Sequence, residues 1–223
     1  MDYDWGMKNV HLSSAGAPAL QAGLAQRLLG LFSRSAAMGL YSGTPATSLD
    51  AASVRSLVAD LQRHGIARAA GVALAPLMRQ GQPDWDEATT RRMEEQLDQV
   101  TQALEASPTP TTEWPAMREI FGDEVLAGLL EVSASSLRRY AAAERATPDN
   151  IAARLHWLAM VVSDLAGAYN DLGMRRWFER PRAQLGGQSP RAALGPDWSP
   201  DDEAAIRVRA LAAALSGAQA LAV

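Results

Sequence analysis

The chain has 223 residues, of which 48% are hydrophobic and only 6% aromatic, a composition that favours helices because strands are enriched in β-branched and aromatic residues. The absence of cysteine excludes disulfides and cysteine-based zinc sites. A net charge of −4 argues against nucleic-acid affinity spread over the whole surface.

The N-terminal segment has no sign of targeting. Residues 1–15 are polar and small, and Asp2 and Asp4 stand where a signal peptide would be cationic. No apolar stretch approaches the ~18 residues that span a bilayer. We therefore expect a cytoplasmic protein with no membrane partner.

The first half predicts an all-α bundle. Its apolar residues recur with the i, i+3, i+4 spacing of amphipathic helices. Residues 1–110 form the first predicted domain, with a role in oligomerisation, in a further partner contact, or none of its own. Helices are expected at Pro18–Met38, from Ser48 or Asp50 to Gly65, at Ile66–Met78 and from Pro83 to Glu105, with a turn at Tyr41–Thr47.

The second half begins after SPTPTTEWP, residues 107–115, whose three prolines predict a linker. Residues 134–182 hold 8 basic and 5 acidic side chains, whereas residues 1–113 hold 9 and 12, so the basic excess follows the linker. Helices are expected at Trp114–Phe121, Asp123–Leu130, Ala134–Ala143, Pro148–Leu172, Met174–Arg182, Ser189–Leu194 and Ser199–Leu215.

The stretch Asp123–Ala143 fits a helix-turn-helix, the second predicted domain at 114–147. Ala127 is the small residue needed where the helices cross, and Ser133 is a natural N-cap for the second helix. Glu131 occupies a turn position that requires the left-handed conformation and usually holds glycine. An ordinary helical hairpin with a solvated arginine face is the alternative. The predicted DNA contacts are Ser135, Ser136, Arg138 and Arg139.

Several motifs together resemble the MbcA/ParS/Xre antitoxin family over residues 114–223. They are SASSLRRY (133–140) followed by Thr147-Pro148, the apolar helix Ile151–Leu172, the segment RRWFERPRAQLGGQSPRAAL (175–194), and a C-terminal Leu/Ala helix. The resemblance implies a helical, dimeric protein that represses its own operon. It also implies that residues 148–223 bind and neutralise a RES-domain toxin, an ADP-ribosyltransferase-like protein that degrades NAD.

The toxin contacts implied by the resemblance lie in two places. Aromatic residues beside arginines are typical of interface centres, and the tail is expected near the entrance of the toxin's active site. The alternatives are that Trp177 and Phe178 cover the core beneath Leu172 and Leu194, and that the tail is a frayed terminus. The predicted contacts are Arg175, Arg176, Trp177, Arg180, Ser216, Gly217, Ala218, Gln219, Ala220, Leu221, Ala222 and Val223.

No residue pattern predicts catalysis. His11, His64 and His156 lack metal-ligand spacing, and Gly186-Gly187 is a turn rather than a phosphate loop. We therefore expect a protein that acts by binding, with no enzyme activity, cofactor or metal. Two rival interpretations remain: a helix-turn-helix regulator without a toxin partner, and an interaction protein that does not bind DNA.

Overall fold

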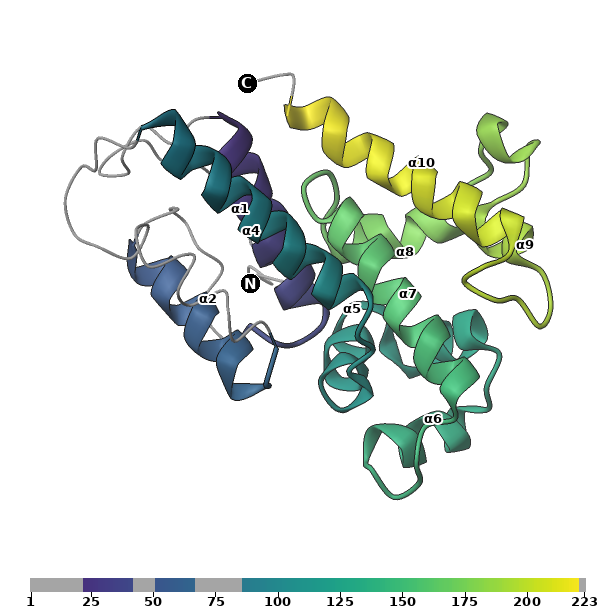
Figure 1. Ribbon diagram of the computed structural model, residues 1–223. Coiled ribbons are helices and arrows are strands. Elements are labelled where there is room, and N and C mark those ends of the chain that lie inside the picture. The colour runs from purple at the N-terminus through teal and green to yellow at the C-terminus, as the bar shows by residue number, and fades with distance from the viewer. Residues whose placement is uncertain (1–21, 42–50, 67–85, 221–223) are drawn as a thin grey trace, which may run out of the picture. The chain divides into compact units, whose positions relative to one another are not determined.

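The computed structural model describes residues 22–41, 51–66 and 86–220. Within these ranges every regular element is a helix, which confirms the expected all-α class (Figure 1). The described residues divide into two compact units between Ser107 and Pro108. The first unit holds α1, α2 and α4, and the second holds α5 to α10.

The first unit is built on a parallel pair of helices, α1 (Ala22–Ala37) and α4 (Glu87–Glu105). Arg27 contacts Asp98 (2.9 Å), and Arg34, seven residues later, contacts Glu105 (2.8 Å), so both helices run in the same direction. Their apolar seam repeats at three- and four-residue intervals, as in a coiled coil. α2 (Ala51–Arg63) completes the unit. The seam residues are Leu24, Leu28, Leu31, Met93, Leu97, Val100 and Leu104, all buried.

Several expectations for the first half lie outside the described residues. α4 begins at Glu87 because the Asp86 carboxylate caps it by accepting from Thr89 N (2.7 Å). The Thr89 side chain and then this backbone N–H hold the pKa of Asp86 below its usual value. Outside the described ranges are residues 1–15, the start of the first predicted helix at 18–21, most of the predicted turn (42–47), the caps Ser48 and Asp50, the predicted helix over 67–78, and 83–85.

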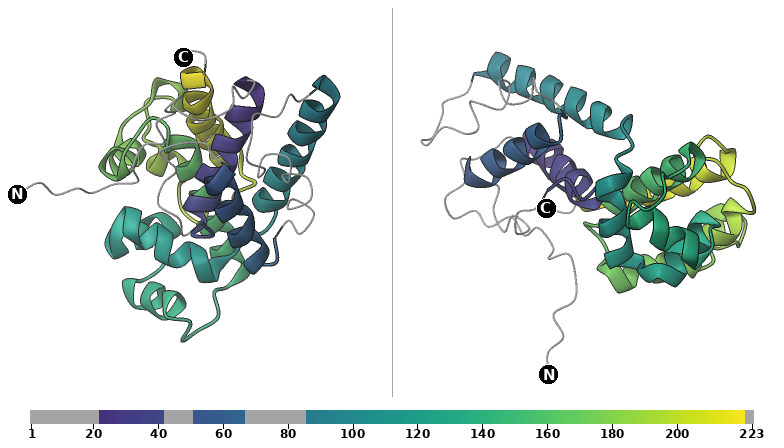
Figure 2. Two further views of the ribbon diagram at one scale, coloured as in Figure 1. Left: turned by 90° about the vertical axis from the view of Figure 1, so that its left-hand side faces the viewer. Right: turned by 90° about the horizontal axis from the view of Figure 1, so that it is seen from below.

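The second unit is organised around α7 (Asp149–Leu165). Every residue of α7 from Arg154 to Leu165 is buried, as expected for a helix that is largely apolar on all sides. α5 and α10 both pack against α7, and α10 lies beside it in Figures 1 and 2. The other elements are α5 (Pro110–Leu130), α6 (Ala134–Ala141), α8 (Asp171–Glu179), the short 3-10 helix η1 (Ala183–Leu185), α9 (Pro190–Leu194) and α10 (Glu203–Ala220).

α5 is two helical segments joined at Gly122. Gly122 has φ 72° and ψ 164°, a conformation that is essentially restricted to glycine, and it separates segments 110–121 and 123–130. Arg118 and Asp123 form an ion pair (2.7 Å) across this kink. The predicted break between Phe121 and Asp123 is therefore confirmed.

Several predicted boundaries are wrong, among them the ends of the helices expected at Met174–Arg182 and Ser199–Leu215, which lie at Asp171–Glu179 and Glu203–Ala220. The linker over 107–115 is too long, because Pro110 occupies the first helical position, where its missing N–H removes no helical hydrogen bond. α7 ends at Leu165 rather than Leu172, since Asn170 caps a new helix by accepting from Gly173 N. α10 begins at Glu203 rather than at Ser199.

Candidate functional site

The turn between α5 and α6 has the backbone geometry that the sequence predicts. Glu131 lies in the left-handed region with φ 56° and ψ 42°, and Val132 N donates to Ala127 O (3.0 Å) to close the end of α5. Ser133 then caps α6, its Oγ accepting from Ser136 N (3.1 Å). The predicted N-cap is confirmed, and Glu131 does take the conformation that usually requires glycine.

A polar network around the buried Arg154 explains why a glutamate is tolerated at this turn. Glu131 Oε2 accepts from Arg154 Nη1 (3.1 Å) and from the backbone N of Asp197 (2.7 Å). Arg154, only 6% exposed, also donates to Leu130 O (3.3 Å) and Trp198 O (2.6 Å). These bonds offset the roughly 1–2 kcal/mol that a non-glycine residue loses in the left-handed region.

α6 presents one buried face and one exposed face. Leu137 and Tyr140 are buried, and the Tyr140 ring stacks on Trp114 at a centroid distance of 6.0 Å. On the other side Ser135, Arg138 and Arg139 are exposed and Ser136 is half-buried. The four predicted DNA contacts therefore lie on the side of α6 that is turned away from its buried residues.

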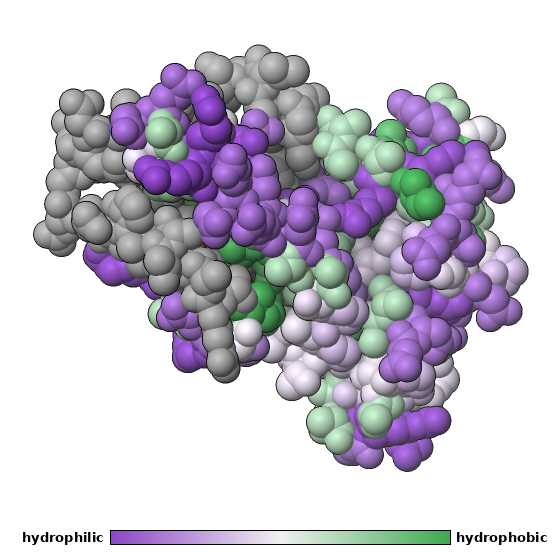
Figure 3. Space-filling view, viewed as in Figure 1, coloured by the Kyte–Doolittle hydropathy of each residue, from purple (hydrophilic) through white to green (hydrophobic). Residues whose placement is uncertain are grey.

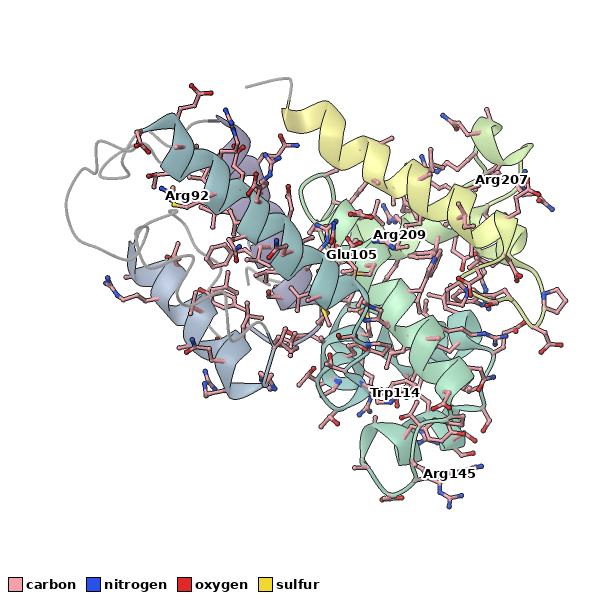
Figure 4. The ribbon with its side chains drawn as sticks, in the orientation of Figure 1. Arg92, Glu105, Trp114, Arg145, Arg207 and Arg209 are labelled. Carbon is pink, nitrogen blue, oxygen red and sulfur yellow. The ribbon has the colours of Figure 1, made fainter. Side chains whose placement is uncertain are left out.

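The first segment of α5 packs against α6. Trp114 Nε1 donates to Thr147 Oγ1 (2.9 Å), so the tryptophan joins α6 to the start of α7. Next to it, Glu113 is completely buried and its Oε1 lies 2.6 Å from Nδ1 of His156. Figure 4 shows Trp114 between the helices and Arg145 beyond the end of α6. The helix that carries these arginines thus packs against buried side chains of α5.

The charges near α6 leave its arginines accessible. In the described part of the chain, neither Arg138 nor Arg139 takes part in an ion pair. The nearby Asp123 accepts two hydrogen bonds from Arg118, which lower the pKa of Asp123, and the charge of Arg138 lowers it further. Arg145, an exposed cation just after α6, lies over the Tyr140 ring at 5.6 Å. Arg138, Arg139 and Ser135 are called the α6 face below.

The predicted toxin contacts on α8 have different environments. Trp177 is fully buried and packs edge-to-face on Phe178 (5.1 Å), which is the core position that the alternative describes, while its contact with a partner stays a prediction. Arg175 is half-buried and donates to Ile120 O and to Glu119 O (3.4 Å), where the first segment of α5 ends. Arg176 and Arg180 are exposed.

No family model matches this sequence, and no curated protein and no solved structure matches it either. Within the described ranges, no helix is both long and apolar enough to cross a bilayer. The same ranges contain no group of three histidine or acidic side chains that is able to hold a metal ion.

The predicted tail contacts are only partly within the described residues. The backbone from Ser216 to Ala220 continues α10, whereas Leu221, Ala222 and Val223 lie outside the described ranges. Earlier in α10, Ala205, Val208 and Ala212 are buried, while Ile206 is 57% exposed. Figure 3 shows hydrophobic colouring along this helix on the viewed face. α10 therefore carries apolar surface on its outer side as well as its inner side.

The sequence interpretation missed Arg154, Trp198 and Arg182. Arg154 is a lone charge inside the apolar run of α7, and such a residue needs buried hydrogen-bond acceptors, which is a usable signal. Trp198 donates through Nε1 to Leu129 O (3.0 Å), but its loop position gives no periodic signal. Arg182 lies over the Trp177 ring at 5.4 Å, a contact that only the fold reveals.

Proposed function

We propose that this protein is an antitoxin-type repressor, which binds operator DNA through the α6 face and holds a protein toxin through its C-terminal residues. The supporting observation is the junction of α5 and α6. There a left-handed Glu131, a Ser133 cap and a buried Tyr140 direct Ser135, Arg138 and Arg139 outward. Residues 123–130 and α6 act as a helix-turn-helix, in which the start of the second helix meets base edges and nearby arginines hold phosphates.

The pairing of the acidic side chains near α6 favours DNA binding over a purely protein-binding role. Of the four acidic residues near this turn, Asp123 is paired with Arg118 and Glu131 with Arg154, so both already have a cationic partner. Glu119 and Glu124 are exposed, and they are the features that favour the rival interpretation of an interaction protein without DNA binding. Arg138 and Arg139 are not neutralised by described neighbours and remain available to phosphate.

The toxin is proposed to be the RES-domain, NAD-degrading protein that the family resemblance implies. Arg176 and Arg180 on α8 and the apolar outer side of α10 are accessible surfaces of the kind that protein partners cover. Binding is proposed to occur without catalysis, and a homodimer would place two α6 faces on successive half-sites of the operator. A regulator without a toxin partner would share the DNA activity alone.

The test is binding of the full-length protein to the DNA upstream of its own gene, measured at several salt concentrations. We expect the double variant Arg138→Gln/Arg139→Gln to lose about 100-fold in affinity, and its slope of log K against log salt to fall by about 2. The matched control is Arg91→Gln/Arg92→Gln, another adjacent and exposed arginine pair, located on α4. Figure 4 shows Arg92 projecting from that helix.

Two results would decide against the DNA role. If wild-type protein does not retard this DNA, or if the α6 variant and the α4 control bind equally well, the interaction-only interpretation holds. The toxin role is tested separately by co-expression with the product of the adjacent gene. Survival of the cells only when the antitoxin is present is the expected result.

A further inference from the structure

A surface hollow of about 250 Å³ lies where the start of α8 meets the segment before η1. In the part of the chain that the structure describes, three arginines line it together with polar and aromatic groups, and no acidic residue does. The lining residues are Tyr169, Asn170, Leu172, Gly173, Arg176, Trp177, Arg180 and Arg182. The chemistry of this lining calls for an anion.

The arginines of the hollow are not neutralised by the described part of the chain. Neither Arg176, Arg180 nor Arg182 forms an ion pair there. Glu179, an acidic residue of α8 next to them, is already paired with Arg191 (3.0 Å). Three guanidinium groups around one hollow repel each other in the absence of an anion, so their grouping is unfavourable for folding alone. A bound anion removes that repulsion.

Arg182 is held in position before any ligand arrives. Its guanidinium lies over the buried Trp177 ring at 5.4 Å, and its backbone is fixed by bonds to and from residues 185–188, including Arg182 N to Gln188 O (2.9 Å). The Nε atom of Arg182 and the Nε1 atom of Trp177 are buried and have no hydrogen-bond partner among the described residues. A donor that is buried and unpaired beside a hollow is suited to a ligand acceptor.

The floor of the hollow also has a defined shape. Tyr169 packs against Gly173 so closely that a Cβ at Gly173 would lie 2.9 Å from Tyr169 Cδ1. Leu172 at the rim is 52% exposed and, with Ile206, is one of the two large apolar side chains that are exposed in the described residues. The volume falls below the roughly 300–1,000 Å³ of pockets for drug-sized ligands, so the hollow suits a single side chain better than a nucleotide.

We propose that this hollow takes the carboxylate of an acidic side chain presented by the partner protein, with an apolar neighbour of that residue covering Leu172. Arginine forks match a carboxylate in a bidentate manner, and the apolar rim favours a protein surface over a free inorganic anion. The proposal rests on the proposed function, because the toxin is the protein that supplies the carboxylate. It assigns Arg182, together with Arg176 and Arg180, to that interface.

The experiment measures affinity of the full-length protein for the purified RES-domain product of the adjacent gene. We expect Arg176→Gln/Arg180→Gln to weaken binding about 100-fold, and Arg176→Lys/Arg180→Lys to weaken it less, because lysine keeps the charge but not the fork. The control Arg91→Gln/Arg92→Gln removes the same charge from α4 and should bind as wild type does. Thermal unfolding of each variant checks that the fold is retained.

A second set of measurements identifies the anion. Arg180→Glu should abolish binding, and one Asp→Arg or Glu→Arg substitution in the toxin should restore it by at least tenfold, which locates the partner carboxylate. Glutarate and inorganic phosphate are titrated into the antitoxin alone by calorimetry. Tight binding of either, with toxin affinity unchanged in the glutamine variants, would overturn the proposal in favour of a free-anion site.

The results distinguish toxin binding as such from the carboxylate site. If the wild-type protein fails to bind the toxin at all, the proposed function is wrong. If the wild type binds and the glutamine variants bind equally well, the toxin interaction stands and the carboxylate site is wrong.

Discussion

The α6 face and the arginine hollow of α8 both consist of arginines, but the surroundings of the two sets of arginines differ. On α6 the arginines lie on an exposed face beside a capped helix start, a geometry suited to an extended polyanion such as DNA. On α8 they surround a hollow over a buried tryptophan, a geometry suited to one anionic group. The difference indicates that the arrangement around an arginine, rather than arginine content, determines what it recognises.

The supports beneath the two regions also differ in chemistry. The turn before α6 depends on a polar network in which the buried Arg154 binds Glu131 and the carbonyl of Trp198. α8 depends on aromatic packing, in which Phe178 contacts both Trp177 (5.1 Å) and Phe121 (5.6 Å). A polar network fails when one member is removed, whereas aromatic packing weakens in proportion to the volume lost.

The largest effect is expected for Arg154→Met. This change leaves the Glu131 carboxylate without its cation and the carbonyls of Leu130 and Trp198 without a donor. We expect the free energy of unfolding to fall by about 3–5 kcal/mol, measured by urea denaturation. Arg207→Met, which removes an exposed arginine paired only with Glu203, should change it by less than about 0.5 kcal/mol. Equal effects of the two changes would show that the network does not support the turn.

A matched pair of tryptophans sharpens the contrast. Trp198→Phe removes volume and also the hydrogen bond from Nε1 to Leu129 O, so we expect a loss of about 2–3 kcal/mol. Trp177→Phe removes a similar volume from a similarly buried site, but Trp177 Nε1 has no hydrogen-bond partner among the described residues. We therefore expect its free energy of unfolding to fall by only about 1–2 kcal/mol. Urea denaturation of both variants gives the comparison. A larger loss at Trp177 than at Trp198 would contradict the division into polar and aromatic supports.

Glu131→Gly tests how the turn balances strain against bonding. Glycine relieves the left-handed strain by roughly 1–2 kcal/mol but removes the acceptor of Arg154 and of the Asp197 N–H. We expect a net loss of about 1 kcal/mol in the free energy of unfolding. Glu131→Ala, which loses the bonds without relieving the strain, should lose about 2 kcal/mol or more. A glycine variant more stable than the wild type would mean that the network contributes little.

The sequence predicted local features well and side-chain partnerships poorly. The cap at Ser133, the break at Gly122 and the inward positions of Leu137 and Tyr140 follow from local propensity and periodicity. The role of Arg154 depends on acceptors in Leu130 and Trp198, up to 44 residues away, which no local pattern specifies. Trp177 showed the same limit, since an aromatic beside arginines is compatible with a surface or a core position until the neighbouring helices are placed.

The smallest effect concerns the ion pair beside the α6 face. Hydrogen bonds from Arg118, and then the charge of Arg138, lower the pKa of Asp123 in the folded state. Stabilisation from Asp123 is therefore complete above its unfolded pKa, near 4, and is lost as the pH falls through the lower folded value. Because both partners are partly exposed, this contribution is below about 1 kcal/mol.

Asp123→Asn should therefore lower the free energy of unfolding slightly at pH 7 and make its acid dependence between pH 5 and 3 shallower, as urea midpoints at several pH values would show. The same change removes a negative charge that acts on Arg138, so affinity for the upstream DNA should rise a few-fold at pH 7. Arg118→Gln has the opposite consequence, because it leaves Asp123 free to pair with Arg138, and DNA affinity should fall. If both variants shift DNA affinity in the same direction, the charge balance around Arg138 does not control the access of phosphate to the α6 face.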